Sequence, residues 1–374
     1  MTTGLRSGYL TPYVRPTVAG VLVAGLVLAA GCVATADGGM ESGTAVASRN
    51  AGAGPSRPAS FASPSRPAFG TYKDVTVHRA DGSAALLTAL DGPPTPVVRA
   101  MPAAQTTLTW AFATGECGAE TWGGATAADF AAANVPMFTA ARKHYIVSTG
   151  GEAGRFTCAT DAGFDRFLAR YESPWLDGVD FDIEAGQTPQ MIDDLVARVA
   201  RARDAHPRLR WSFTLATLGG TRAQSLGDPG VTTMKALRAH GLADDPRIVI
   251  NLMVMDYGPA DPVSCVVGAD QQCDMGASAV KAAERLHDDW GVPWARIELT
   301  PMIGGNDSPG NTFTVRDVDT VSAFVRAKGL AGVRFWSLDR DTDCPPAAAS
   351  NVCNTVGGVG NWGYATRFLA ALGY

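Results

Sequence analysis

The chain has 374 residues, of which 46% are hydrophobic, so it can bury a substantial core in one large domain or two ordinary ones. Its formal net charge of -5 does not indicate nucleic acid or an anionic membrane surface as a partner. There is no Cys-x-x-Cys pair and the five histidines do not cluster with cysteines, so we expect no metal and no cofactor.

The N-terminal segment has the pattern of an export signal. Arg6 and Arg15 precede the apolar run VAGVLVAGLVLAA, which is short for a membrane span. The ending LAAGC resembles a bacterial lipobox, which predicts a signal peptide over residues 1–32 with Cys32 as the lipidated residue. Cleavage after Ala36 is the alternative. Both interpretations predict an exported bacterial protein, either secreted or held at the cell surface by a lipid anchor.

Two further segments follow the signal. Residues 33–66 are mostly Ala, Gly, Ser and Pro, a composition that cannot bury enough apolar surface to fold and that predicts a disordered linker. From residue 67 to residue 374 the hydrophobic pattern becomes regular. This part is predicted to be the catalytic domain.

The cysteine count suits an exported protein, because six cysteines remain once Cys32 is set aside. Close spacing favours the pairs Cys265–Cys273 and Cys344–Cys353, which leaves Cys117 with Cys158. Spacing alone does not fix this connectivity.

Eight strands are predicted to alternate with helices. The strands are expected at 72–77, 107–112, 145–149, 178–184, 209–217, 248–257, 296–303 and 332–338. Helical patterns lie at 129–143, 161–171, 191–206, 278–290, 318–329 and 363–374, with a weaker one at 83–90 and N-caps at Asp161 and Thr188. This alternation predicts an α/β fold, a (β/α)8 TIM barrel. A doubly wound open sheet is the alternative, but no glycine-rich phosphate loop follows the first strand.

The fourth predicted strand carries an unusual set of acids, in the stretch LDGVDFDIE (176–184). Side chains alternate between the two faces of a strand, so Asp180, Asp182 and Glu184 share one face. The other face carries Val179, Phe181 and Ile183. In a barrel, the acidic face would point inward and rise toward the C-terminal mouth, where barrel enzymes carry their chemistry.

Three neighbouring carboxylates cannot all ionise cheaply, so at least one pKa is expected to rise. A carboxylic acid that is still protonated near neutral pH is what general acid catalysis requires. Asp177 has the opposite parity and is expected before the strand, where it would hydrogen-bond the turn. Two other interpretations are a Mg²⁺ or Ca²⁺ site and a buried polar network without chemistry. The stretch DRDTD (339–343) is similar to a calcium loop, but Cys344 stands where that loop needs Gly.

These residues resemble the signature of family 18 glycoside hydrolases, the chitinases and their relatives. The DxxDxDxE pattern is formed by Asp177, Asp180, Asp182 and Glu184. Ser148 to Gly151 (STGG) is similar to the family's SxGG, in which Gly150 and Gly151 are structural. Met255 to Tyr257 (MDY) is similar to its M-x-Y, and Trp336 to the tryptophan that floors the substrate cleft. The resemblance covers 67–374 in order, and MVMDYG, TPMIGGND and FWSLDRD are most similar to the bacterial and archaeal subgroup that includes hyperthermophile chitinases.

The resemblance implies a mechanism. Glu184 would be the general acid and then the general base, and the substrate's own acetamido carbonyl would be the nucleophile, with retention of configuration. Asp182 would orient the acetamido N–H, while Asp180 would share a proton with Asp182 and be supported by Ser148. Tyr257 would donate to the acetamido oxygen, and Trp336 would stack under the sugar.

The sequence also departs from the family pattern. Many members carry Asp after the M-x-Y tyrosine, where this chain has Gly258, so Asp256, expected on the opposite face of the strand, or Asp307 would have to assume that role. Met255 is expected to pack below the acids, on the same face as Met253 and Tyr257. Two tryptophans, Trp110 and Trp122, could extend the sugar platform or simply pack in the core. His144 is expected to be structural.

The first functional hypothesis is a monomeric chitinase that hydrolyses β-1,4 links between N-acetylglucosamine units of chitin or its oligosaccharides. The first alternative, an endo-β-N-acetylglucosaminidase acting on N-glycans, shares the same motif. The second alternative is a non-catalytic chitin-binding protein, which is less expected because Glu184 is present.

Overall fold

In the computed structural model, the described part of the chain is residues 66–374 without positions 81, 153, 185 and 347–348. The predicted signal peptide, Cys32 and nearly all of the predicted linker lie outside it and stay predictions. Within the described residues, no helix is long and apolar enough to cross a membrane.

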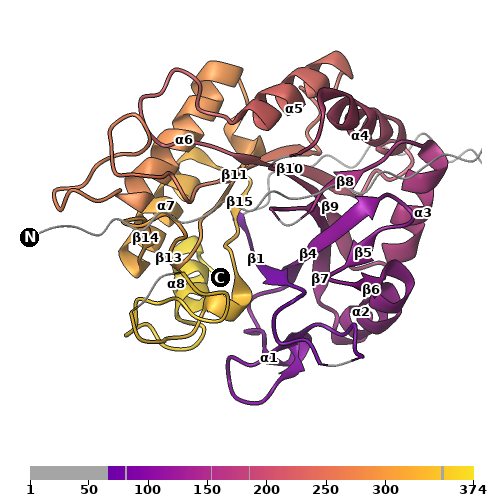
Figure 1. Ribbon diagram of the computed structural model, residues 1–374, viewed down its shortest axis with the longest axis horizontal. Helices are drawn as coiled ribbons and strands as arrows, with labels where there is room; N and C mark the ends of the chain where they lie inside the picture. Colours follow the sequence, from indigo (N-terminus) through magenta and orange to yellow (C-terminus); the bar gives the residue numbers. More distant parts are fainter. Residues whose placement is uncertain (1–65, 81, 153, 185, 347–348) are drawn as a thin grey trace, which may run out of the picture. The chain divides into compact units, whose positions relative to one another are not determined.

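Eight parallel strands close into a barrel (Figure 1), which confirms the predicted (β/α)8 architecture. They are β1 (Ala68–Asp74), β4 (Thr107–Glu116), β7 (His144–Gly150), β9 (Leu176–Ile183), β10 (Arg210–Ala216), β11 (Ile248–Met253), β12 (Ile297–Thr300) and β15 (Gly332–Val333). Each strand pairs with the next in this order, and β1 pairs with both β4 and β15. Closure removes the sheet edges and turns one face of every strand inward.

The helices lie between consecutive strands, outside the barrel (Figure 1). The longer ones are α2 (Ala127–Ala141), α3 (Asp161–Tyr171), α4 (Pro189–Ala202), α5 (Asp228–Ala239), α6 (Met275–Trp290), α7 (Val315–Lys328) and α8 (Gly363–Leu372). Thr188 caps α4 as predicted, but the cap of α3 is Thr160, and Asp161 is its first helical residue. The helix α5, with Pro229 and Gly230 in its first turn, has no clear helical pattern in the sequence.

The segment at 83–90 does not form the weakly predicted helix. Instead, β2 (Leu87–Thr88) pairs with β3 (Thr95–Pro96), and the short α1 (Val97–Ala100) follows. The other short elements are β5 (Thr121–Trp122), β6 (Ala125–Thr126), β8 (Phe156–Thr157), β13 (Gly304–Gly305), β14 (Thr312–Phe313) and the 3-10 turns at Trp294–Arg296 and Leu338–Arg340.

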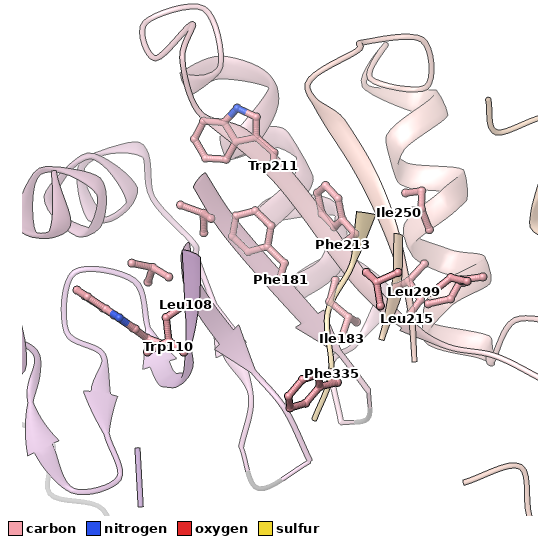
Figure 2. Close-up of a cluster of buried hydrophobic side chains, with 14 of the residues drawn as sticks. Leu108, Trp110, Phe181, Ile183, Trp211, Phe213, Leu215, Ile250, Leu299 and Phe335 are labelled. Carbon is pink, nitrogen blue, oxygen red and sulfur yellow. The ribbon is translucent and has the colours of Figure 1, made fainter. Parts of the chain in front are cut away.

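The hydrophobic core lies between the barrel and its helices. Phe181 of β9 packs on its neighbours of β10, with its ring 6.5 Å from the ring of Trp211 and 5.2 Å from that of Phe213. Figure 2 shows these side chains together with Ile183 and Leu215. Each fully buried side chain of this size contributes about 1.5–3 kcal/mol. The apolar face of the acidic strand is therefore its outer face, as its sequence predicts.

The lower barrel interior is held by a buried ion network. Glu298 of β12 is fully buried and accepts hydrogen bonds from Arg210 at 2.7 and 3.0 Å and from Arg334 at 3.0 Å. Although burial opposes its charge, the two guanidinium groups hold the pKa of Glu298 down at about 2. Removing a buried partner leaves the other charges uncompensated, so this network is expected to matter for stability.

We expect Glu298→Gln to lower the free energy of unfolding at pH 7 by about 3–5 kcal/mol, measured by urea denaturation. Because the folded pKa is depressed, the stabilisation from Glu298 is present above its unfolded pKa of about 4.3 and is lost as the pH falls toward 2. The matched control is Asp319→Asn, which breaks the exposed pair with Arg367 and should cost under about 1 kcal/mol. Equal losses in both variants would contradict this role of the network.

The structure contains three disulfides, in the pairing that spacing favours. They join Cys117 to Cys158, Cys265 to Cys273 and Cys344 to Cys353.

Candidate active site

A cavity of about 500 Å³ lies at the C-terminal ends of the strands. Residues from β1, β9 and β10 line its base, and segments that follow β7, β11 and β15 line its walls. Asp182 and Glu184 both line it. The alternation of β9 thus brings these two acids to the mouth, where a barrel carries its chemistry.

Asp180 lies deeper, and its carboxylate is fully engaged. Tyr72 and Ser148 donate to Oδ2 at 2.9 and 2.7 Å, and Ser212 and Thr214 donate to Oδ1 at 2.6 and 2.8 Å. These four hydroxyls come from β1, β7 and β10, so Asp180 ties the strands together around the base of the site. A carboxylate with four donors is held in one orientation and has its acceptor positions filled.

A second layer orients those donors. The side-chain amide of Asn251 donates to the hydroxyls of Tyr72 and Thr214 at 3.0 and 2.9 Å, and its oxygen accepts from Thr300 at 2.8 Å. Because Asn251 occupies the acceptor positions of both hydroxyls, their protons point toward Asp180. The network is complete without any group from outside the protein.

Asp182 is in the opposite situation. It is 4% exposed, and its Oδ1 is buried without a hydrogen-bond partner among the described residues. Burial, followed by the charges of Glu184 and Asp180, raises the pKa of Asp182 well above its usual range. Because Asp182 lines the cavity and one of its buried oxygens lacks a partner among the described residues, its carboxyl is a candidate binding position for a ligand N–H or O–H.

Glu184 follows β9 directly and is half-buried at the cavity. Burial, with added repulsion from Glu152 and Asp256, raises the pKa of Glu184 to about 7. This group can therefore hold a proton near neutral pH and release it to a bound molecule. One pKa in the acidic stack was expected to rise, and the pKa values of both Asp182 and Glu184 are raised.

Two glycines at the end of β7, Gly150 and the following Gly151, allow the acidic strand to approach. A Cβ on Gly150 would lie 2.1 Å from the carbonyl oxygen of Asp182, and one on Gly151 would lie 2.7 Å from the ring of Phe112. Both have positive φ, 91° and 80°, which side chains rarely adopt. The STGG segment thus seats Ser148 under Asp180.

An aromatic platform forms one side of the cavity. Trp336 is half-buried and lies almost parallel to Phe112, with 5.5 Å between the ring centroids and 13° between the planes. The ring of Tyr72 is 6.2 Å from that of Trp336. An exposed aromatic face beside carboxylic acids is suited to the apolar face of a sugar ring.

The fold is similar to that of chitinase catalytic domains. The catalytic domain of the hyperthermophilic chitinase from Pyrococcus furiosus aligns with a TM-score of 0.62 and 22% identity, over 82% of this chain and 96% of that one. Catalytic-site mutants of active domain 2 of the same organism's chitinase, complexed with chito-oligosaccharides, give the same score and identity. YKL-39, solved in the presence of chitooligosaccharides, aligns at 0.50 and 13%, over 82% of this chain and 99% of that one. The sequence matches no protein-family model and no curated protein. At these identities, the likeness shows the fold.

Trp122 and Trp110 do not extend the platform. Trp122 is 1% exposed, stacks on Phe130 at 4.0 Å and donates to the hydroxyl of Tyr171. Trp110 is fully buried and stacks on Tyr145 at 4.1 Å. The proposed sugar contact of Trp122 is therefore wrong, because the short β5–β6 hairpin turns its side chain toward α2 and α3.

The predicted alternation after β11 is also wrong. The strand ends at Met253 rather than at residue 257, and Asp256 has a left-handed φ of 49°, which changes the direction of the chain. Met255 and Asp256 consequently line the same cavity, although opposite faces were expected. Tyr257 is buried, is not among the residues lining the cavity, and its hydroxyl has no hydrogen-bond partner among the described residues.

Asp256 and Asp307 both line the cavity, so each is near enough to serve in place of the family aspartate. Asp256 is the more fixed of the two, because its Oδ1 accepts from the backbone N–H of Ser308 at 2.8 Å. Its own N–H donates to Asn306 at 3.2 Å. Asp307 is exposed.

Asp177 lies at the other end of β9 as its second residue, not before the strand. A register shift between β7 and β9 at this point sets it outside the regular pairing. It contacts Nδ1 of His144 at 2.6 Å and accepts from Thr107 at 3.3 Å. Asp177 and His144 are therefore structural, as expected.

Sequence reasoning missed several residues of the site. Tyr72 and Phe112 were included in strands without a role, and Asp74 and Glu152 were not singled out, although all four line the cavity. The available signal was the position of Asp74 at the end of β1 and of Glu152 just beyond β7, and the place of Tyr72 and Phe112 in the C-terminal halves of β1 and β4. Asn251, Ser212 and Thr214 share the inward parity of their strands, and that parity could have identified them.

Proposed function

We propose that the protein is a glycosidase that hydrolyses β-1,4 links between N-acetylglucosamine units, with the substrate's acetamido group as the nucleophile. The observation that carries this proposal is the difference between the three carboxyls of β9. Asp180 is fully hydrogen-bonded, Asp182 lines the cavity with a buried oxygen that has no partner among the described residues, and the pKa of Glu184 is raised to about 7. Two of the similar structures, the Pyrococcus furiosus chitinase mutants and YKL-39, were solved with chito-oligosaccharides, which agrees with this substrate class.

In the first step, Glu184 gives its proton to the oxygen of the glycosidic bond. As this bond breaks, the carbonyl oxygen of the 2-acetamido group attacks the anomeric carbon and forms an oxazolinium ion. Asp182 accepts the acetamido N–H with its unpaired Oδ1 and stabilises the developing positive charge. The half-buried face of Trp336 supports the sugar ring.

In the second step, the Glu184 carboxylate removes a proton from water, and the resulting oxygen attacks the anomeric carbon. The oxazolinium ring opens, and the product has the configuration of the substrate because two inversions have occurred. Asp180 holds Asp182 in place through the shared strand and does not touch the sugar. Met255 and Asp256 line the cavity and the adjoining hollow together with Glu184, which places them to contact the sugar.

The test is hydrolysis of chitin oligomers compared with release of N-glycans from a glycoprotein, using the purified full chain. We expect cleavage of the oligomers. Release of N-glycans without cleavage of oligomers would favour the endo-β-N-acetylglucosaminidase, and tight binding without any turnover would favour a binding protein.

Tyr257 offers a separate prediction. If its buried hydroxyl donates to the acetamido oxygen in the complex, Tyr257→Phe should lower kcat by about 10²-fold with little change in thermal stability. Steady-state kinetics and thermal unfolding of the same samples check this. Unchanged kcat with equal or higher Tm would instead assign the tyrosine to the core.

A further inference from the structure

The cavity carries more acidic side chains than the proposed reaction needs. Six carboxylates line it, and none of its described lining residues is lysine, arginine or histidine. They are Asp74, Glu152, Asp182, Glu184, Asp256 and Asp307. The proposed chemistry uses two of these, Asp182 and Glu184, and Asp256 is hydrogen-bonded to Ser308. Asp74, Glu152 and Asp307 are left without a function.

Among the described residues, none of these three acids forms a salt bridge, although the charge of Arg340 acts on Asp307 and that of Lys73 acts on Asp74. Lys73 is fully buried and bonded to Asp339 at 2.6 Å, and buried Arg340 donates to the carbonyl of Ile303. Arg79 donates to the carbonyl of Gly123, and Arg222 lines the adjoining hollow beyond Glu184 rather than this cavity. Glu152 and Asp307 are exposed, and Asp74 uses only Oδ1, which accepts from Thr76.

The arrangement does not suit a single metal ion. A cation site needs several ligand atoms around one point. Among the described residues, the set of three metal-binding side chains that converges within 4.8 Å is Glu116 with Cys117 and Cys158, and these two cysteines form a disulfide. Within the part of the chain that the structure describes, the ligand atoms of the cavity acids form no such converging set. Dispersed carboxylates match a ligand that carries several positive charges along its length.

We propose that this cleft takes partly N-deacetylated substrates and binds protonated glucosamine units next to the reacting sugar. The inference rests on the proposed function, because the reacting unit itself must keep its acetamido group as nucleophile. The neighbouring units need no acetamido group, and loss of the acetyl turns a neutral amide into an ammonium ion without changing the ring. Glu152, Asp307 and Asp74 are the carboxylates that attract these ions.

Carboxylates also accept hydrogen bonds from the hydroxyls of neutral sugars, so their presence alone does not separate the two roles. The amides Gln and Asn still accept such hydrogen bonds, but they have no charge. Neutralising substitutions therefore weaken the attraction of ammonium groups selectively. The informative quantity is the ratio of kcat/KM for a partly deacetylated oligomer to that for the fully acetylated oligomer of the same length. Both substrates are measured on the same variant, so any effect of the substitution on the chemical step that they share divides out of the ratio.

The experiment measures this ratio for the wild type, Glu152→Gln, Asp307→Asn and the double variant. The control is Glu284→Gln on α6, an exposed acid outside the cavity. We expect a ratio above one for the wild type and the control, and a fall of about two- to fivefold for each neutralised carboxylate. Raising the ionic strength should also lower the wild-type ratio, because salt screens the attraction between the carboxylates and the ammonium groups.

Product sequencing by mass spectrometry provides a second readout. After digestion of partly deacetylated chitin of known composition, the new reducing ends should be acetylated, and the units beside the cut should be enriched in glucosamine. The preference would be overturned if the units beside the cut had the same composition as the polymer and the wild type and variants gave the same kcat/KM ratio. That result would leave the proposed function intact. Failure to cleave either substrate would overturn both.

Discussion

Glu184→Gln should lower kcat on chitin oligomers by about 10²–10⁴-fold while leaving oligosaccharide binding nearly unchanged. Gln has the shape of Glu and keeps its hydrogen bonds, but it cannot give a proton to the glycosidic oxygen. Steady-state kinetics and calorimetric binding of the same oligomer measure the two effects. The binding measurement separates loss of chemistry from loss of the site.

The control for this substitution is Glu284→Gln on the outer helix α6, which should retain wild-type activity. If Glu184→Gln kept more than a tenth of the wild-type kcat, another group would be the acid. If it lost binding as well, the glutamate would be needed to hold the site together.

The pH profile follows from the same residue. In the proposed mechanism the free protein needs protonated Glu184, whose pKa is raised to about 7, so kcat/KM should fall as the pH rises through about 7. Burial is the first cause of the raised pKa, and the charges of Glu152 and Asp256 add to it. Asp256→Asn should therefore move this alkaline limb to lower pH. A limb that moves to higher pH would contradict the assigned repulsion.

Asp182→Asn should lower kcat by about 10²–10³-fold, the second large effect that we expect. An amide in this place can still accept a hydrogen bond, but it lacks the negative charge that stabilises the oxazolinium ion. Since Asp182 is 4% exposed and its Oδ1 has no partner among the described residues, the neutral amide should be tolerated in the fold. Kinetics and thermal unfolding of the variant check both statements.

Asp177→Asn is the matched control because it lies on the same strand, at the far end of the barrel, against His144. Its activity should stay within about twofold, since none of its hydrogen-bond partners among the described residues, His144 and Thr107, lines the cavity. Comparable activity losses in both variants would show that the strand, and not the carboxyl of Asp182, causes the effect.

The acidic strand was the part of the site that the sequence could predict. Period-two alternation placed Phe181 outside and Asp182 inside, and the barrel determined which end of the strand carries Glu184. The same logic failed beyond Met253, because a left-handed residue, Asp256, interrupts the alternation on which the prediction depends. No local pattern predicts a single positive φ at an aspartate.

Contacts between segments far apart in the sequence were the second feature that could not be predicted. That Tyr72 donates to Asp180 depends on β1 closing the barrel beside β4 and β15, which strand-by-strand reasoning does not supply. Trp122 looked like a platform residue because it follows a strand end, and only the hairpin of β5 and β6 reveals that it packs on Phe130. The eight barrel strands and most of the long helices could be predicted from the sequence, but α5, the β2–β3 pair and the direction of individual side chains in loops could not.

Substrate assistance is tested most directly by replacing the acetamido group of the reacting sugar with a hydroxyl in an aryl disaccharide substrate. We predict that the wild-type protein hydrolyses the acetamido substrate, and that the hydroxyl analogue competes for the site but is not cleaved, because the protein supplies no nucleophile of its own. Hydrolysis of the analogue at a rate within tenfold of the acetamido substrate would contradict the account.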